Sequence, residues 1–288
     1  MRLRTFWKVV ITFGVLAFFV FAAALVVGLI ASELVLQSEV PFIGGGVVMV
    51  IPIKGEITSG GCPSGLFYSE QCATVDTVKE HLDKAGKDMS VSAVVLDIDS
   101  GGGSVVASRE MMRAVRDFNK PVVARIGEAG ASGAYYVASA ADKIVADKDS
   151  ITGSIGVVMD IMHYYKLMDN WGVNVSVIKS GQSKDIGSPY RPMTREEREN
   201  LQELVDSVMD DFVSDVAANR NLSVEYVRNI SDGSIYLGGK AKELGLVDYL
   251  GGYDDAVELA GNLSGMSGMP EVKKPKEGVG LLDVLSGR

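Results

Sequence analysis

The sequence predicts an α/β protein with an N-terminal transmembrane helix. Short runs of apolar and β-branched residues, such as Val91–Ile98, are typical of buried strands. They alternate with segments in which apolar residues recur at helical spacing, as in Val105–Phe118. Glycine-rich turns join the two kinds of segment. Strand, turn, helix and strand in succession indicate parallel strands connected by crossover helices.

The predicted transmembrane helix is the uncharged stretch of residues 9–32. At ~1.5 Å per residue, a helix of this length spans a ~30 Å hydrocarbon core. Basic side chains precede the stretch and Glu33 follows it, so residues 1–8 are expected in the cytoplasm and the rest outside. A cleaved signal peptide is the alternative, but its apolar region usually has only ~7–15 residues. We therefore expect a single-pass protein of the cell membrane with an extracytoplasmic folded part.

A linker over residues 33–46 follows the anchor and leads into a buried strand that ends near Lys54. The stretch Gly55–Cys72 has the composition of a loop and holds both cysteines of the chain. Outside the cytoplasm, Cys62 and Cys72 can form a disulfide that closes this loop. Two free thiols are the alternative.

The folded part is predicted over residues 47–262. The longest helix is expected at Thr194–Asn219, where Thr194 and Glu197 form a capping box and one apolar stripe suits core or subunit contact. Gly, Ser, Pro and Lys predominate in residues 263–288, which we expect to form a flexible tail. The other predicted elements are strands at Pro121–Ile126, Ile144–Ala146, Gly156–Met159 and Val173–Ile178, and helices at Thr74–Lys87, His163–Trp171, Ser223–Ile230, Ala241–Leu244 and Asp254–Leu263.

The composition limits the classes of function. The chain has 288 residues and a formal net charge of -9, which argues against nucleic acid as a partner. It has two cysteines and two histidines, so a zinc site with Cys and His ligands is not expected.

Ser132 lies at the junction between a predicted strand and a predicted helix. Its neighbours Gly130, Ala131 and Gly133 permit a tight turn, and the helix would direct its N-terminal N–H groups toward the serine. A serine nucleophile on a strand-to-helix turn has this arrangement, although Ala134 replaces the last Gly of G-x-S-x-G. The alternative is that small residues merely allow close packing of helix and sheet.

A serine nucleophile needs a base, and this chain offers few. His81 and His163 both fall in predicted helices, and His163 would complete a Ser-His-Asp set. Lys184 instead lies in a polar loop after a predicted strand. To act as a base its pKa must fall by ~3 from about 10.4, which burial can cause. A solvated surface charge is the alternative role for this lysine.

The turn Gly101–Gly103 ends a predicted buried strand and exposes backbone N–H groups that can stabilise an oxyanion. A plain tight turn or a phosphate cradle are the alternatives. Its spacing matches neither the G-x-G-x-x-G pattern nor the P-loop, which argues against a nucleotide site.

Five segments in order resemble the signal peptide peptidase A family in its short, single-unit form. The resemblance covers roughly residues 47–262 together with the anchor. One departure is Gly101, which stands where the family has proline. The five segments are Asp99–Gly103, Ala131–Tyr136, Ile151–Val157, Lys179–Asp185 and Lys240–Asp248.

The resemblance implies a Clp/crotonase-like fold of repeated ββα units and a Ser/Lys-dyad protease. By position, Ser132 is the nucleophile and Lys184 the general base. Ser154 would orient the lysine, and the N–H groups of Gly102 and Gly133 would bind the oxyanion. This chemistry needs no cofactor and no metal.

The resemblance further implies a ring-shaped homo-oligomer in which one active site takes Ser and Lys from different subunits. The expected substrates are cleaved signal peptides or other hydrophobic peptides at the extracytoplasmic membrane face. Two alternatives differ in substrate or class. One is a Ser/Lys protease dedicated to a specific membrane protein, and the other is a non-proteolytic, acyl-CoA-binding relative of crotonase.

Overall fold

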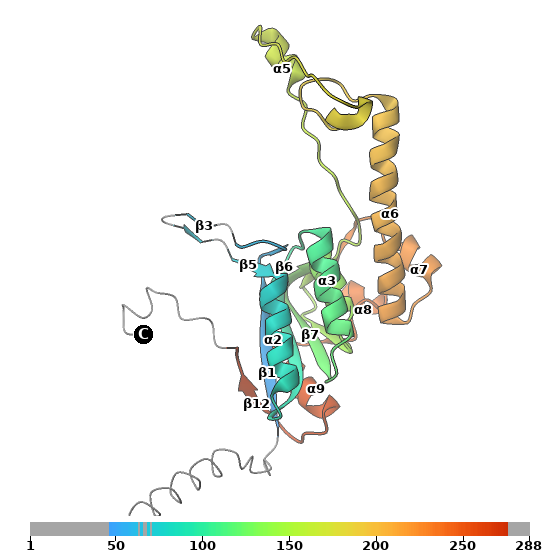
Figure 1. Ribbon diagram of the computed structural model, residues 1–288. Helices are drawn as coiled ribbons and strands as arrows, with labels where there is room; N and C mark the ends of the chain where they lie inside the picture. Colours follow the sequence, from blue (N-terminus) through green and yellow to red (C-terminus); the bar gives the residue numbers. More distant parts are fainter. Residues whose placement is uncertain (1–45, 63, 66–67, 70, 276–288) are drawn as a thin grey trace, which may run out of the picture. The chain divides into compact units, whose positions relative to one another are not determined.

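The computed structural model describes residues 46–62, 64–65, 68–69 and 71–275 (Figure 1). The chain divides into two compact units, Met1–Gly44 and Gly45–Arg288, and the described residues belong to the second. The predicted cytoplasmic segment 1–8 and anchor 9–32 lie outside the described residues. Among the residues that are described, no helix is both long enough and apolar enough to cross a bilayer.

An eight-stranded sheet forms the centre of the described unit. Its main path runs β10-β9-β7-β6-β1-β12, and β8 pairs with both β7 and β11. The pairs are parallel except for β9 with β10, as the crossover pattern of the sequence predicts. The strands are β1 (Val47–Lys54), β6 (Val91–Ser100), β7 (Val122–Ala131), β8 (Lys143–Ala146), β9 (Ile151–Gly153), β10 (Ile235–Leu237), β11 (Tyr249–Leu250) and β12 (Glu271–Lys273).

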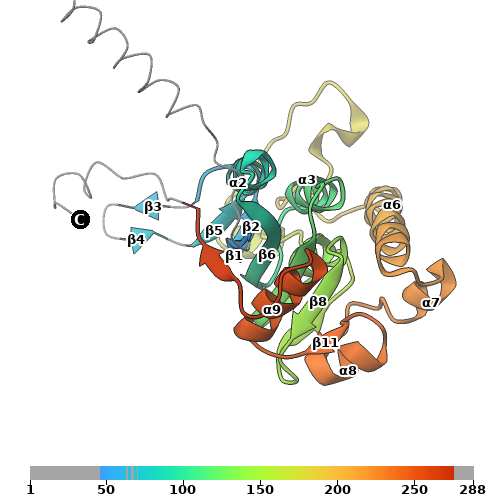
Figure 2. The same cartoon turned by 90° about the horizontal axis from the view of Figure 1, so that it is seen from below.

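The central strands are buried on both faces because helices cover the sheet from both sides (Figure 2). Alternate residues of β1 and β6 face the helices α2 (Val75–Lys87), α3 (Val105–Arg116) and α4 (Gly133–Ser139). The intervening residues pack against α9 (Tyr253–Leu263) on the other face. The period of two along each strand therefore divides the apolar side chains between two cores.

The longest predicted helix is present as α6 (Arg195–Arg220). Its capping box is also as predicted: Glu197 N–H donates to Thr194 Oγ1 at 3.1 Å, and Thr194 N–H donates to the Glu197 carboxylate at 2.9 Å. The apolar stripe is buried only in its second half, at Phe212, Val213 and Val216. Leu204 in the first half is 58% exposed. The short helices α7 (Val224–Asn229) and α8 (Gly238–Glu243) follow.

Two predicted strands are wrong. Residues 156–159 and 173–178 have no regular secondary structure, and both lie in a segment, residues 156–193, that we call the arm. The arm carries α5 (Tyr165–Asn170) and a 3-10 helix, η1 (Gln182–Asp185), and Figure 1 shows α5 beyond the N-terminal end of α6. The alternating apolar residues of Val173–Ile178 predict a strand only where a neighbouring strand pairs with them, and none does among the described residues.

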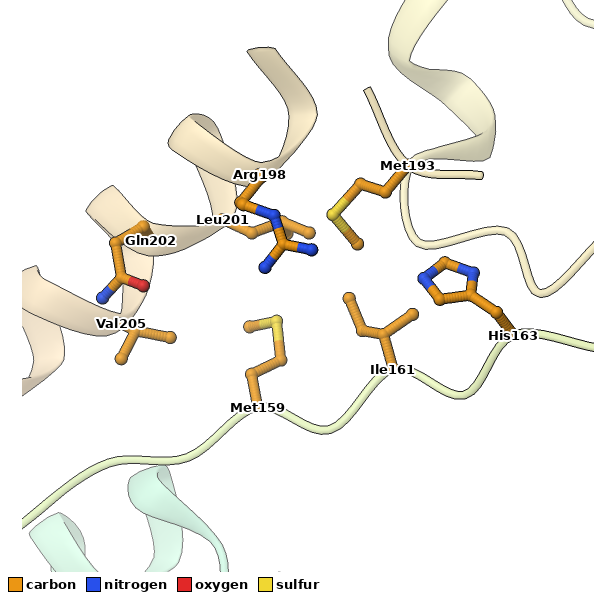
Figure 3. Close-up of a pocket in the computed structure, with 8 residues that line it drawn as sticks. All are labelled: Met159, Ile161, His163, Met193, Arg198, Leu201, Gln202 and Val205. Atoms are coloured by element: carbon orange, nitrogen blue, oxygen red, sulfur yellow. The ribbon is translucent and has the colours of Figure 1, made fainter. Parts of the chain in front are cut away.

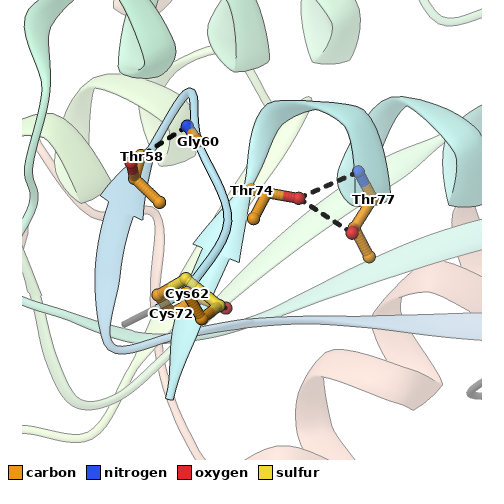
Figure 4. The surroundings of a disulfide bond; sticks show 6 residues. All are labelled: Thr58, Gly60, Cys62, Cys72, Thr74 and Thr77. Atoms are coloured by element: carbon orange, nitrogen blue, oxygen red, sulfur yellow. Dashed lines mark hydrogen bonds between the residues drawn. A yellow bond between two sulfur atoms is a disulfide. The ribbon is translucent and has the colours of Figure 1, made fainter. Parts of the chain in front are cut away.

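The disulfide between Cys62 and Cys72 is present, with the two Cα atoms 5.4 Å apart (Figure 4). It closes the loop between β2 (Glu56–Thr58) and β5 (Cys72–Thr74), which pair in parallel. Within this loop, β3 (Ser64–Gly65) and β4 (Tyr68–Ser69) form a two-stranded antiparallel ladder. Thr74 then caps α2 by accepting a hydrogen bond from Thr77 N–H at 3.2 Å.

The segment predicted to be a flexible tail, residues 263–288, contains a strand in its described part. β12 pairs in parallel with the first residues of β1, from Val47 to Met49. Backbone hydrogen bonding can therefore hold this polar segment at the edge of the sheet without any apolar pattern.

We predict that Tyr135→Phe lowers the free energy of unfolding by about 1–3 kcal/mol, because it leaves a buried carbonyl unpaired. Tyr135 is fully buried, and its hydroxyl donates to the Leu246 carbonyl at 3.0 Å. Tyr226→Phe is the matched control, since Tyr226 makes the same kind of bond to Leu244 at 3.2 Å but is 38% exposed. Its effect should stay within about 0.5 kcal/mol. Urea denaturation of the full chain in detergent measures both, and equal losses would contradict the prediction.

Candidate active site

Ser132 joins β7 to α4 in a strained backbone conformation. Its φ of 52° and ψ of -124° lie in a region that non-glycine residues rarely adopt, at a cost of roughly 1–3 kcal/mol. Two bonds hold it there: Ser132 N–H donates to the Gly153 carbonyl at 2.9 Å, and Tyr136 N–H donates to the Ser132 carbonyl at 2.9 Å. The Ser132 side chain makes no capping bond to α4. The turn is therefore held by backbone bonds and does not use the Ser132 hydroxyl.

The glycine turn after β6 packs directly against Ser132. Gly102 has a φ of +106°, and a Cβ there would lie 2.7 Å from Gly133 N and 3.0 Å from Ser132 Cβ. The two predicted oxyanion donors differ in this structure. Gly133 is the first residue of α4, so its N–H has no acceptor within the helix. Gly102 N–H instead donates to Ser100 Oγ at 3.1 Å.

Gly103 belongs to the predicted glycine turn and offers a further N–H group, whereas the resemblance pointed to Gly102 as the donor. A bridge to β2 uses its neighbours: Ile57 N–H donates to the Gly102 carbonyl at 2.9 Å, and Ser104 N–H donates to the Ile57 carbonyl at 2.8 Å. In this parallel pattern Gly103 N–H points away from β2. Gly103 N also lies only 3.3 Å from where a Gly133 Cβ would be. Two N–H groups, of Gly103 and Gly133, are thus neighbours beside the serine.

Two cavities adjoin Ser132. The smaller, which we call the apolar cavity, has a volume of about 110 Å³ and is lined by Val105, Ser108, Tyr136 and Phe212, among others. The larger, which we call the polar cavity, has a volume of about 410 Å³. Its polar lining consists of Ser154, Gln202, Asp206, Ser231 and Asp232. The serine therefore has an apolar and a polar side.

The apolar cavity is fixed by contacts among three helices. Tyr136 of α4 packs on Phe212 of α6, with ring centroids 4.5 Å apart. The Tyr136 hydroxyl donates to the Asp215 carboxylate, and burial followed by this carboxylate raises the pKa of Tyr136. Arg109 of α3 pairs with Asp211 of α6 at 2.8 Å. These polar bonds between α3, α4 and α6 therefore hold the walls of the cavity in place.

The predicted base does not meet the nucleophile within this chain. Lys184 lies in η1 with an exposed side chain and lines neither cavity beside Ser132. Ser154, the predicted orienting residue, does line the polar cavity, and its N–H donates to the Ser234 carbonyl at 2.8 Å. The chain thus brings Ser132, Ser154, Gly102 and Gly133 together, and leaves Lys184 on the arm.

Neither histidine lines the cavities beside Ser132. His81 is buried in α2. His163 is exposed on the arm, where it lines a separate cavity of about 220 Å³ between the arm and α6 (Figure 3). Met159, Ile161, Met193, Leu201 and Val205 form the apolar part of that cavity. Within the described residues, no group of three or more His, Cys, Asp or Glu side chains could hold a metal ion.

A polar cluster that we call the Arg191 clamp fixes the turn that carries Lys184. Arg191 donates to both carboxylate oxygens of Asp185, from Nε and Nη2 at 2.9 Å each. It also donates from Nη1 to Glu197 at 2.8 Å, and Glu197 belongs to the capping box of α6. Arg191, and after it Lys179, holds the pKa of Asp185 well below its ordinary value. Arg191 and the Thr194 N–H lower the pKa of Glu197 to about 2.

Comparisons with known proteins show the family of the chain. Residues 114–267 match the model of Peptidase family S49. A putative protease of Methanocaldococcus jannaschii is 50% identical over 193 residues, which cover 66% of this chain and 62% of that protein. A putative signal peptide peptidase SppA of Enterococcus faecium is 35% identical over 214 residues, covering 73% of this chain and 62% of the relative. The matched part thus spans less than two thirds of either relative.

The fold resembles one of two solved structures more than the other. A mutant of the membrane-bound stomatin-specific protease 1510-N superposes with a TM-score of 0.52 and 13% identity, over 82% of this chain and all of that chain. A mutant of ClpP1 from Listeria monocytogenes gives a TM-score of 0.47 and 15% identity over 72% of this chain. The first of these supports the mixed α/β fold class predicted from the sequence.

We predict that Arg191→Ala loosens the turn that carries Lys184 in a pH-dependent way. Asp185 and Glu197 have depressed pKa values, so the stability that they contribute is present above the ordinary carboxyl pKa of about 4. It is lost as the pH falls toward the depressed values. Hydrogen-exchange protection of residues 182–197 should therefore differ between the variant and wild type at neutral pH, and this difference should shrink as the pH falls from about 4 toward 2.

Arg195→Ala is the control for this measurement. Arg195 lies nearby at the start of α6 and pairs with Glu199 at 2.7 Å, but its side chain is 90% exposed. Exposed pairs of this kind contribute little to stability. A loss of protection in Arg195→Ala equal to that in Arg191→Ala, or a difference that does not depend on pH, would contradict the prediction.

Proposed function

Because the chain belongs to Peptidase family S49, we propose that it is a serine endopeptidase whose nucleophile is Ser132. The observation that carries this proposal is the strained turn at Ser132, which presents an uncommitted hydroxyl beside free backbone N–H groups. Ser132 Oγ attacks a peptide carbonyl, and the carbonyl oxygen becomes an oxyanion. Gly133 N–H, at the start of α4, is directed to where that charge develops.

The second oxyanion donor comes from the glycine turn. Gly102 N–H serves if substrate binding releases it from Ser100 Oγ, to which it donates in the free chain. Gly103 N–H, which points away from β2, serves without such a change. Either donor lies next to Gly133 N and so completes a pair of N–H groups around one oxygen.

Lys184 is the general base of this proposal. Its neutral amine takes the Ser132 hydroxyl proton and passes it to the leaving amine, and water then hydrolyses the acyl-enzyme. The polar cavity is the route for this amine, because Ser154 can orient it and Asp206 and Asp232 attract it as an ammonium ion. The two carboxylates favour the ammonium form, so the neutral amine that the mechanism needs depends on the apolar lining of Val157, Val158 and Met209, which disfavours a charged group.

The amine comes from a neighbouring copy in a ring-shaped homo-oligomer. The arm supports this part of the proposal, since several of its apolar side chains are not covered by the described part of the chain. Val158 is 80% exposed, Trp171 79% and Ile178 100%. Large apolar surfaces of this kind are typical of protein–protein contacts. An arm that docks on the next copy buries these side chains and carries Lys184 toward another Ser132.

The substrates are residual signal peptides or other hydrophobic peptides at the extracytoplasmic face of the membrane. The apolar cavity beside Ser132 suits small or aliphatic side chains. The disulfide fits an oxidising compartment, and the uncharged stretch 9–32 would keep the enzyme close to bilayer-derived peptides. A putative signal peptide peptidase is among the relatives.

We predict that Ser132→Ala and Lys184→Ala each lower kcat by at least ~10³-fold on signal-like peptides, because each removes a group that acts in the transition state. The full chain in detergent is the enzyme for this assay. His163→Ala is the control and should keep activity within about threefold, since its side chain lines neither cavity beside Ser132. Full turnover by Ser132→Ala would refute the proposed function. If only His163→Ala loses activity, the base is His163 and not Lys184.

The sharing of sites between copies has its own test. Ser132→Ala and Lys184→Ala chains, assembled together in equal amounts, should regain activity at about a quarter of the sites, where an intact serine meets an intact lysine. Ser132→Ala assembled with the double variant should stay inactive. If the first mixture is also inactive while wild type is active, each site is formed within one chain.

A further inference from the structure

Ser108 is a buried hydroxyl that no group in the described part of the chain satisfies. It lies on α3 with 1% of its surface exposed, and its Oγ has no hydrogen-bond partner among those residues. Serines within helices commonly bond back to a carbonyl one turn earlier, and this one does not. An unpaired buried hydroxyl costs about 1–3 kcal/mol. Such a group calls for a partner that is supplied from outside the chain.

Ser108 shares a cavity with the nucleophile. Ser108 lines the apolar cavity together with Ser132 and Gly133. A Cβ on Gly133 would lie 2.3 Å from Ser108 Oγ, so glycine at that position leaves the room that the hydroxyl occupies. Tyr136 also lines the cavity, but its hydroxyl is already bonded to Asp215. Ser108 Oγ is therefore an uncommitted polar atom in the wall of a cavity that Val105 and Phe212 otherwise make apolar.

The two cavities beside Ser132 suit different parts of the reaction. The polar cavity holds Ser154, Asp206 and Asp232 and is the side from which an amine base approaches in the proposed mechanism. The apolar cavity lies beside Gly103 and Gly133, whose N–H groups would bind the carbonyl oxygen. A side chain attached next to that carbonyl enters the cavity on the same side. With about 110 Å³, this cavity accommodates one small or medium side chain.

We infer that the apolar cavity takes the substrate side chain that immediately precedes the scissile bond, and that Ser108 selects a hydroxyl-bearing side chain there. Threonine and valine have the same shape, but only threonine pairs with the Ser108 hydroxyl. A site with a buried polar group discriminates strongly against an analogue that leaves the group unpaired. The inference rests on the proposed function and specifies which peptides that site prefers.

The test compares two peptides that differ only in Thr or Val before the cleaved bond. Wild-type full chain in detergent should show a kcat/KM that is roughly 5- to 100-fold higher for the Thr peptide. Ser108→Ala should bring the ratio to within about threefold of unity, chiefly by slowing cleavage of the Thr peptide. Ser104→Ala is the matched control, because Ser104 is exposed one turn earlier and its side chain makes no capping bond. It should keep the wild-type ratio.

Two results would overturn the inference. One is equal kcat/KM for the two peptides in wild type, which needs no variant and so does not depend on whether Ser108→Ala folds. The other is a ratio that Ser108→Ala leaves unchanged while both rates fall equally, since that result would make Ser108 a group acting on the reacting carbonyl. The variant Ser132→Ala distinguishes a failure of the proposed function from a failure of the role of Ser108. Full turnover of both peptides by that variant refutes the proposed function, whereas an inactive Ser132→Ala with an unselective wild type refutes only the role of Ser108.

Discussion

The site depends on one backbone constraint, the left-handed conformation of Ser132. The last three residues of β7 pair with β9, and this register carries the Gly153 carbonyl to the Ser132 N–H. The bond from Tyr136 N–H to the Ser132 carbonyl then joins the serine to the first turn of α4. Neither bond involves the serine hydroxyl. The strand pairing and the first turn of the helix therefore keep Ser132 in its strained conformation without using the hydroxyl. A serine in a relaxed turn would lose the alignment of its Oγ with the helix N-terminus.

The same constraint divides the surroundings of the serine. β9 leads directly to Ser154 and the polar cavity, whereas α4 leads to Tyr136 and the apolar cavity. α6 closes both, because Phe212 lines one and Met209 the other. The helix can do this because Tyr136, Asp215, Arg109 and Asp211 tie it to α3 and α4. The single helix α6 therefore lines both the cavity proposed for the substrate side chain and the cavity proposed for the base.

Much of the central fold follows from local sequence patterns, because burial on both faces of a parallel sheet imposes apolar runs and helical crossovers. The helix cap at Thr194 and the disulfide are likewise local or nearly so. The strand predicted at Val173–Ile178 failed because a strand needs a partner, and its apolar side chains are exposed in this chain. Pairing over long sequence separations is not encoded in a run of seven or fewer residues.

The site shows the same limit. The serine turn and the glycine turn can be located from spacing, but the direction of each N–H depends on the β2 contact to Gly103 and on Ser100. Ser108 was visible only as one position on the apolar face of a predicted helix. Its importance comes from the lack of a hydrogen-bond partner among the residues that the structure describes, and no sequence pattern reports such a lack. The Arg191 clamp joins residues six apart through a loop, and no helical or strand period predicts such a contact.

The exposed arm has a consequence for the life of a newly made chain. A copy that has not yet found neighbours displays Ile178 and Trp171 to water, and the stretch around them has the alternation that favours intermolecular strand pairing. Such a copy is vulnerable to aggregation and to digestion by other proteases. If copies assemble as proposed, the abundance of the chain would govern its survival as well as its activity, since sparse copies would be removed before they met.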